Sequence, residues 1–140
     1  MRLKNRKKIK EEDDPFHFCI GTVLHVNCWG NELGDVRTDQ FSLDPGIKWA
    51  DCHCLPFLDR SFDTAIIGHV PVNDRLVERQ KWIDELARVA RKRVVIVQDG
   101  IFQIPGFHFS FYYGKKGTKD KPKMVIMSIY DREETGGASS

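Results

Sequence analysis

In the middle of the chain, one strongly amphipathic segment lies between two runs of apolar residues. The runs at 64–68 and 93–97 have the unbroken apolar character of strands that are buried on both faces. Between them, apolar residues at helical spacing predict a helix that begins after Asn73 or Asp74 and ends near Ala90. A strand, a helix and a second strand in this order are typical of an α/β protein.

Shorter runs of strand-forming residues lie on both sides of this central unit. The runs before it span 22–27, 35–39 and 47–51. After it, the runs at 107–113 and 124–130 predict an antiparallel hairpin with a lysine- and glycine-rich loop. Together the runs, the predicted helix and the hairpin indicate an α/β fold with a mixed sheet.

The composition is that of one globular domain. The chain has 140 residues, of which 41% are hydrophobic and 30% are charged. We expect a flexible charged arm at 1–15, a single domain at 16–132 and a disordered tail at 133–140. No apolar run approaches the ~20 residues of a membrane span. The basic start is followed by acidic residues rather than by an apolar segment, so we expect a cytoplasmic protein with reduced cysteines and no membrane partner.

The net charge of +2 is small, but the basic residues are clustered. They gather in the arm, at the end of the predicted helix, and in the loop at 114–123. Such clusters could follow the phosphates of DNA or RNA, or they could be ordinary solvated surface. We therefore keep nucleic acid as a candidate partner.

Three strand ends carry residues that suit an adenosine ligand. Ligands of doubly wound sheets bind at the carboxyl ends of the strands. The first strand ends in a turn at 27–30, where Gly30 would let the backbone approach a ligand. Asp39 ends the second strand and could accept both ribose hydroxyls, while Asp51 and the amide that follows it could recognise the edge of adenine.

Two stretches of the sequence resemble a known family. The stretch WADCHCLPFLDRSFDTAIIGHV is similar to the core of class I S-adenosylmethionine-dependent methyltransferases, and ELARVARKRVVIV resembles the helix and strand that follow. The resemblance covers 22–97, and the terminal hairpin is similar to the family's last strands. It implies a truncated Rossmann-like methyltransferase fold, with a mostly parallel sheet and a C-terminal antiparallel hairpin, and S-adenosylmethionine as the cofactor.

The resemblance also implies roles for single residues. The cofactor loop would be formed by Asn27, Cys28, Trp29 and Gly30. Asp39 would hold the ribose, with Asp35 as a substitute, and Asp51 and Cys52 would face the adenine. Gly68, His69 and Val70 would lie near the sulfur. Two features depart from the family: the loop has a single glycine, and only about eight residues join the first two strands, too few for a helical crossover.

The methyl acceptor is expected beside the segment at 69–74. Amino-methyltransferases of DNA and RNA carry an acid or amide, two prolines and an aromatic residue there, and this chain retains Pro71 and Asn73 without the acid or the aromatic. His69 could be a general base or could make a structural hydrogen bond. The candidate nucleic-acid contacts on the hairpin are Tyr112, Tyr113, Lys115 and Lys116.

Two further expectations concern cysteines and phenylalanines. Cys52-His53-Cys54 does not have a standard zinc spacing, so we expect no metal site. Phe107, Phe109 and Phe111 alternate along one predicted strand, so we expect all three to share its core face.

Three functional hypotheses follow. The first is a methyltransferase that acts on nucleic acid or on a nucleic-acid-associated protein. The second is a binding protein with the same fold that has lost turnover and contacts nucleic acid or another chain. The third is a small subunit of a larger methyltransferase, with a partner chain or a second copy covering its open side.

Overall fold

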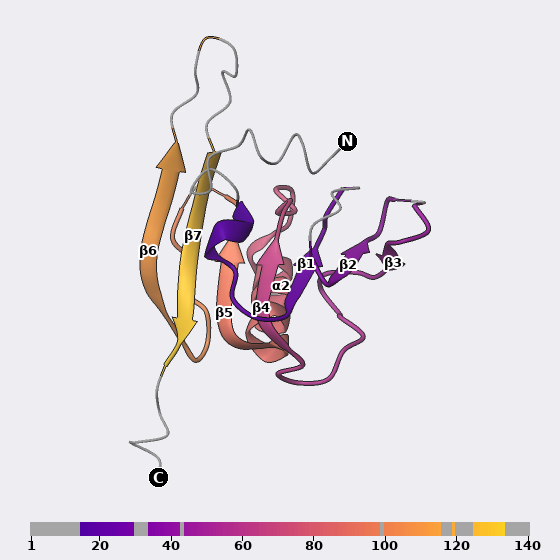
Figure 1. Cartoon of the computed structure of the whole chain (residues 1–140), viewed down its shortest axis with the longest axis horizontal. Coiled ribbons are helices and arrows are strands. Elements are labelled where there is room, and N and C mark those ends of the chain that lie inside the picture. The colour runs from indigo at the N-terminus through magenta and orange to yellow at the C-terminus, as the bar shows by residue number, and fades with distance from the viewer. Residues whose placement is uncertain are drawn as a thin grey trace.

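The computed structural model describes residues 15–29, 34–42, 44–98, 100–115, 119 and 125–133. It begins with the short 3-10 helix η2 (Pro15–Phe18), and it has one α-helix in its described part, α2 (Leu76–Val89). The strands in chain order are β1 (Val23–Val26), β2 (Val36–Asp39), β3 (Lys48–Trp49), β4 (Phe62–Ile67), β5 (Ala90–Ile96), β6 (Phe107–Lys115) and β7 (Val125–Arg132) (Figure 1). Each predicted strand corresponds to one of these seven.

All seven strands belong to one sheet, in the order β3-β2-β1-β4-β5-β7-β6. Strands β1 to β5 are parallel to one another, and β7 is antiparallel to both β5 and β6. The mostly parallel sheet with a C-terminal antiparallel hairpin is therefore confirmed. Since β6 runs in the same direction as β5, it also ends at the edge where the parallel strands end (Figure 1).

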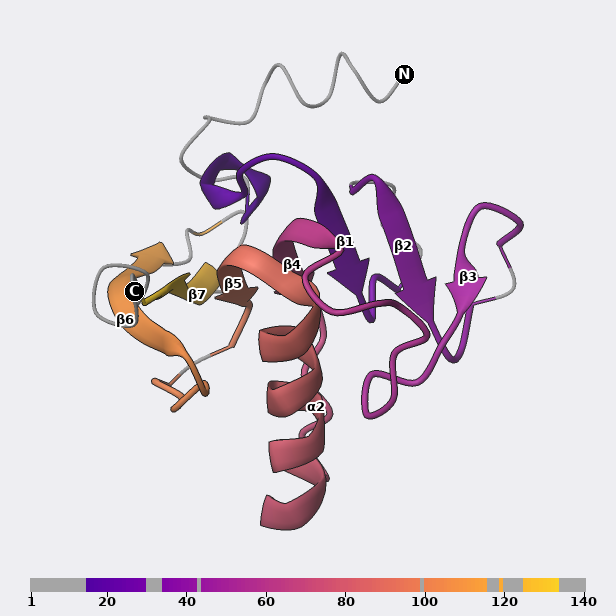
Figure 2. The ribbon, with the colours of Figure 1, turned by 90° about the horizontal axis from the view of Figure 1, so that it is seen from below.

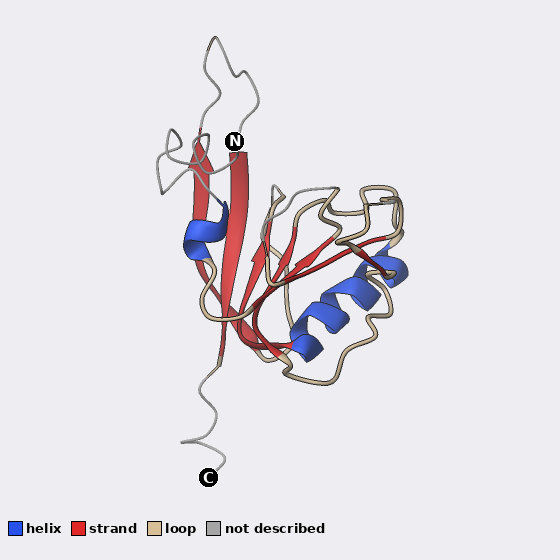
Figure 3. Ribbon diagram, turned by 45° about the vertical axis from the view of Figure 1, so that its right-hand side comes forward, coloured by secondary structure: helices blue, strands red, loops and turns tan. Residues whose placement is uncertain are grey.

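Helix α2 packs on one face of this sheet (Figures 2 and 3). Its buried side chains are Trp82, Ile83, Leu86, Ala87 and Val89. The predicted start is corrected: Arg75 occupies the cap position, and its backbone N–H donates to the Glu78 carboxylate at 3.1 Å. The side chain of Asp74 hydrogen-bonds to His53 instead of capping the helix. Leu76, the first residue of α2, is exposed.

The opposite face of the sheet has a smaller apolar cluster. Its buried members are Val23, Ile66, Val95, Met127 and Ile129, and Phe18 and Cys19 pack against them. The Thr64 hydroxyl donates to the Ile20 carbonyl at 2.6 Å and accepts the Ile20 N–H at 2.9 Å. These two bonds fasten the segment after η2 to β4, so η2 and this segment cover part of the face opposite α2.

A β-bulge in β6 overturns the expectation for its phenylalanines. The register of β6 on β7 shifts between Phe109 and Phe111. Phe109 contacts Tyr130 on the α2 face, with ring centroids 5.8 Å apart, whereas Phe111 contacts Phe18 on the opposite face at 5.3 Å. Because an extra residue in a bulge reverses the alternation, the three phenylalanines do not share a face.

The remaining expectations about organisation concern segments at the ends of the chain. The predicted arm lies outside the described residues except for Pro15, and the predicted tail lies outside them except for Glu133. No helix in the described part of the chain has the length and apolar character needed to cross a membrane.

Candidate functional site

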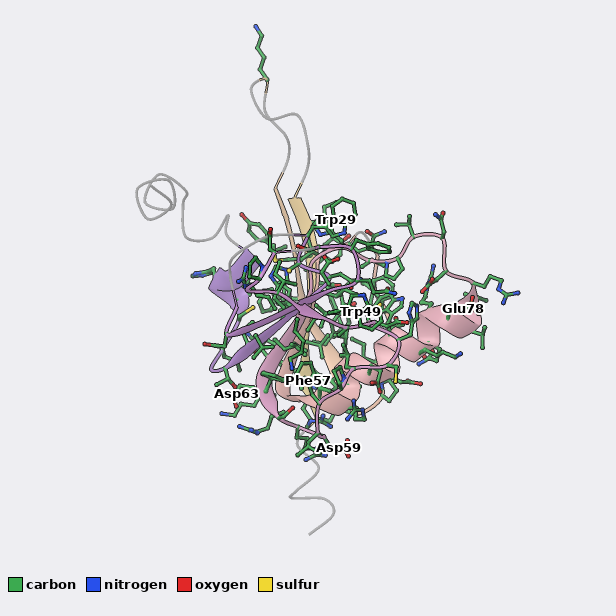
Figure 4. The ribbon with its side chains drawn as sticks, turned by 90° about the vertical axis from the view of Figure 1, so that its right-hand side faces the viewer. Trp29, Trp49, Phe57, Asp59, Asp63 and Glu78 are labelled. Atoms are coloured by element: carbon green, nitrogen blue, oxygen red, sulfur yellow. The ribbon has the colours of Figure 1, made fainter. Side chains whose placement is uncertain are left out.

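The candidate site lies at the edge of the sheet where the parallel strands end. The segments that follow β1, β2, β3 and β4 all begin at this edge, because these strands are parallel. Open α/β sheets bind ligands at this edge. Figure 4 shows Trp29 toward one end of the sheet. Asp59, which precedes β4, and Asp63, near the start of β4, lie toward the other end.

Asp39 ends β2 and connects the β1 and β2 loops. Its carboxylate accepts the backbone N–H of Trp29 at 2.6 Å and that of Phe41 at 2.7 Å, and the residue is 1% exposed. Trp29 has φ of 52°, a left-handed conformation that is unfavourable for a bulky side chain. Hydrogen bonds to a carboxylate are among the stronger ones, so Asp39 stabilises this strained loop.

A pocket of about 220 Å³ lies beside Asp39. Trp29, Phe41, Ser42 and Asp44 also line it, and the two aromatic side chains are 67% and 80% exposed. Typical pockets for small ligands measure about 300–1,000 Å³. The pocket therefore offers aromatic side chains for a planar ring and a carboxylate for hydroxyl groups. In this conformation it accommodates only part of an S-adenosylmethionine molecule.

Gly68 and His69 follow β4 and contact the β1 loop. A Cβ on Gly68 would lie 2.5 Å from His25 Nε2, so glycine is required for the close approach. Asn27 Nδ2 donates to the His69 carbonyl at 2.9 Å, and His69 Nδ1 donates to the Asn27 carbonyl at 3.1 Å. Because a carbonyl can only accept, this bond places a proton on Nδ1.

The tautomer of His69 has a chemical consequence. With the proton on Nδ1, the neutral ring presents the lone pair of Nε2, and no described residue hydrogen-bonds to that atom. The ring lies against Trp29, with centroids 5.0 Å apart. An exposed imidazole with a fixed tautomer at the end of β4 can act as a general base.

Asp51, His53 and Asp74 form a second group of polar side chains at this edge. His53 Nδ1 lies 2.6 Å from Asp51 Oδ1, and Nε2 lies 2.5 Å from Asp74 Oδ2. Burial lowers the pKa of His53, but the hydrogen bonds to both carboxylates outweigh it, so the pKa is raised. Burial raises the pKa of Asp51, but the bonds from His53 outweigh it, so this pKa is lowered. The imidazole thus joins the loop after β3 to the start of α2.

Cys52 lies inside this loop, and its side chain is buried. Its Sγ is 3.7 Å from His53 Nδ1. Burial, with the nearby carboxylates of Asp51 and Asp74, raises the pKa of the thiol to about 12, although a hydrogen bond with the Asn27 side chain acts in the opposite direction. Asn27 therefore contacts both the Cys52 thiol and the His69 carbonyl.

The predicted acceptor residues are divided between several places. Pro71 lines a pocket of about 210 Å³ formed with the loop after β5, and Asn73 is exposed. The Tyr112 hydroxyl accepts the Gly100 N–H at 3.2 Å at the same edge. Tyr113 instead packs against Phe18 on the opposite face, at 5.2 Å. Gly30 and Lys116 lie outside the described residues, as does the side chain of Lys115.

The structure brings Asn27, Trp29, Asp39 and His69 together, as the resemblance implies. It does not bring Asp35 to them, since Asp35 precedes β2 and its carboxylate accepts the Val23 N–H at the other edge. Two participants were missed: Phe41, and the pair of His53 with Asp74. The sequence predicts Asp74 as a helix cap, and its separation of 21 positions from His53 hides their contact.

Comparisons with known proteins bear on the fold. No family model and no curated protein matches the sequence. Among solved structures, a possible histamine N-methyltransferase from Thermotoga maritima is similar with a TM-score of 0.61 and 10% identity, over 95% of this chain and 97% of that one. The chain has the fold of class I methyltransferases.

Further solved structures agree with this assignment. Magnesium protoporphyrin IX methyltransferase from Synechocystis, with bound S-adenosylmethionine, has a TM-score of 0.56 at 14% identity, over 81% of this chain and 70% of that one. A methyltransferase from Methanosarcina mazei has a TM-score of 0.58 at 14% identity, over 92% of this chain and 96% of that one. These similarities establish the architecture in which the candidate site is built.

Proposed function

We propose that this chain is an S-adenosylmethionine-dependent methyltransferase. The observation that supports this most is the buried carboxylate of Asp39, which ends the second strand of a sheet with the methyltransferase strand order and faces a pocket between two exposed aromatic rings. The similar solved structures are methyltransferases, and some contain S-adenosylmethionine or S-adenosylhomocysteine.

Asp39 is the residue that would hold the cofactor's ribose. A carboxylate has about four acceptor positions, and the two backbone N–H groups use only two of them. Trp29 and Phe41 would flank the planar part of the molecule. When bound, the cofactor supplies a methyl group on a positively charged sulfur, and the protein contributes alignment and a polar environment.

His69 is the residue that would accept a proton from the methyl acceptor. Its Nδ1–H bond to the Asn27 carbonyl keeps Nε2 available as the base. The contact with Trp29 limits the orientations of the ring. General bases of this kind typically contribute about 10²–10⁴-fold to a rate.

We further propose that the acceptor is a nucleic acid. Strand β6 carries the exposed Tyr112 to the same edge and ends there at Lys115, where the sequence continues into its lysine-rich segment. An exposed aromatic ring beside lysines suits a base and its phosphates.

Methyl transfer tests both proposals. The protein would be incubated with S-adenosylmethionine carrying a tritiated methyl group and, separately, with single-stranded DNA, RNA or a histone mixture. We expect labelled nucleic acid, with a rate at least about 100-fold lower for His69→Ala. The matched control is His17→Ala, which changes an exposed histidine on η2, a segment remote in sequence from His69. Label on protein alone would overturn the nucleic-acid proposal.

A second candidate function is a binding protein, or an accessory subunit, with the methyltransferase fold. The observations that favour it are the mutual hydrogen bonds of Asn27 and His69 and the small volume of the pocket, since both close the space that a cofactor would occupy. This candidate predicts no label transfer to any acceptor and a stable complex with nucleic acid, a partner chain or a second copy.

A further inference from the structure

The consecutive residues Asp51, Cys52 and His53 place three different ligand atoms in one small volume. An Asp51 carboxylate oxygen, Cys52 Sγ and a His53 ring nitrogen all lie within 4.8 Å of one another. The reason is local: the Cys54 N–H donates to the Asp51 carbonyl at 2.9 Å, and the His53 N–H donates to Asp51 Oδ1 at 2.9 Å. This tight turn directs three neighbouring side chains toward one point.

The distances are close to those of a tetrahedral metal site. With metal–sulfur and metal–nitrogen bonds of about 2.3 and 2.1 Å, a shared ion would separate Sγ and Nδ1 by about 3.6 Å. The observed separation is 3.7 Å. A shared ion would separate nitrogen and oxygen ligands by about 3.3 Å. Nδ1 and Asp51 Oδ1 lie 2.6 Å apart in a hydrogen bond, so the partly exposed Asp51 carboxylate must rotate away from Nδ1 before an ion can bind between them.

Asp74 supplies the outer partner that histidine ligands ordinarily have. Metal-binding histidines usually donate the second ring N–H to a carboxylate, which fixes the ring and strengthens the ligand. Asp74 Oδ2 lies 2.5 Å from His53 Nε2, on the side of the ring away from Cys52 and Asp51. Cys54 is not part of the group, and its side chain is exposed.

We propose that Asp51, Cys52 and His53 bind a divalent transition-metal ion of the zinc class through a carboxylate oxygen, Sγ and Nδ1. A thiolate and an imidazole select zinc or cobalt rather than magnesium or calcium. Binding displaces one proton from Sγ and one from Nδ1 to solvent, and the charges of the thiolate and the Asp51 carboxylate then balance the ion. The three protein ligands leave the fourth position for water.

The site adjoins the proposed catalytic residue without depending on it. The Asn27 side chain hydrogen-bonds to Cys52 and donates to the His69 carbonyl, so one side chain separates the two centres. The ion would fix the loop after β3 and, through Asp74, the start of α2. The inference goes beyond the proposed function, and it holds or fails whether or not the chain transfers methyl groups.

The test is a titration of the metal-free full chain with cobalt(II), followed by displacement with zinc. We expect one cobalt ion per chain and a sulfur-to-cobalt absorption band in the near ultraviolet. Cys52→Ser should remove the band, and Asp74→Asn should weaken the affinity by about 10–100-fold. Cys54→Ser is the matched control, since it removes the exposed thiol two residues away, and it should retain the band and the affinity.

Two results would overturn the proposal. One is a folded wild-type chain that gives no cobalt band and no zinc displacement at high micromolar metal. The other is a band that disappears in Cys54→Ser while persisting in Cys52→Ser, which would assign the binding to the exposed thiol. Circular dichroism of every variant shows whether the fold is intact, and His53→Gln provides a second variant that removes a ligand while leaving both thiols in place.

Discussion

Asp39 combines a structural and a proposed binding role in one side chain. Asp39→Ala leaves the backbone N–H groups of Trp29 and Phe41 without their acceptor. Each of these part-buried donors, left unsatisfied, costs about 1–3 kcal/mol, so we expect the free energy of unfolding in urea to fall by about 2–6 kcal/mol. Asp39→Asn, which keeps one carbonyl oxygen, should lose less. Asp44→Ala, an exposed aspartate at the same pocket, should change stability little.

Trp29 and Trp49 are both 67% exposed, which makes them a matched pair. Trp29 lines the pocket and contacts His69, whereas Trp49 is on the edge strand β3 and does not line it. An aromatic contact contributes about 0.5–1.5 kcal/mol, so Trp29→Ala should weaken S-adenosylhomocysteine binding by about 2–10-fold. Trp49→Ala should bind like the wild type. Equal losses of affinity for the two variants in calorimetry would show that Trp29 does not contact the ligand.

At the scale of single elements, Glu85 connects α2 to the loop after β3. It accepts the Leu55 N–H at 2.7 Å and pairs with Arg88 at 2.9 Å. Burial raises the pKa of Glu85, but the Arg88 and Leu55 bonds outweigh it, so the pKa is lowered from 4.5. Its contribution to stability is therefore present above pH 4.5 and is lost as the pH falls through the lowered pKa.

Urea unfolding of the wild type and Glu85→Gln between pH 6 and 3 tests this expectation. The wild type should lose more stability over that range than the variant, because the variant has no carboxylate at position 85 to protonate. Asp84→Asn is the control, since Asp84 is exposed one residue earlier on the same helix. Identical pH profiles for wild type and Glu85→Gln would contradict the assigned role.

Trp82 is the largest fully buried side chain of α2. Its indole Nε1 has no hydrogen-bond partner in the described part of the chain, so it contributes through packing. We expect Trp82→Ala to reduce the free energy of unfolding by about 3–5 kcal/mol. Trp82→Phe should cost clearly less, because it keeps a ring and removes the buried donor. A loss for phenylalanine as large as that for alanine would show that the indole nitrogen, rather than the packing of the ring, contributes the stability.

The elements that depend on local pattern could be predicted from the sequence. Unbroken apolar runs predict β4 and β5, and the helical spacing of apolar residues predicts α2. The bulge in β6 could not be predicted, because it depends on pairing with β7. The true helix cap was missed for a similar reason: Asp74 is a good capping residue, but His53 competes for its carboxylate.

The same division holds for the candidate site. Asp39 and His69 could be predicted because Asp39 ends one strand and His69 lies two residues beyond another, and both strands end at the ligand-binding edge. The backbone hydrogen bonds of Asp39 and the tautomer of His69 could not, since both depend on the left-handed turn at Asn27 and Trp29. The convergence of Asp51, Cys52 and His53 depends on a local bridge that no spacing rule describes.

At the scale of the whole molecule, the chain builds the methyltransferase sheet with one α-helix in its described residues. Loops replace helical crossovers after β3 and β5, and a short segment covers part of the second face (Figure 3). The parallel order of the strands nevertheless gathers Asn27, Asp39 and His69 at one edge. We propose that this edge still binds the cofactor.

Calorimetric titration with S-adenosylhomocysteine tests that claim most directly. The wild type should bind one molecule per chain with a Kd in the micromolar range. Asp39→Asn, which removes the charge while keeping one oxygen that can accept a backbone N–H, should bind at least about tenfold more weakly. Asp84→Asn, an exposed aspartate on α2, should match the wild type. Absence of heat from a folded wild-type chain at high concentration would contradict the claim, and the fold would then serve as a binding module without its cofactor.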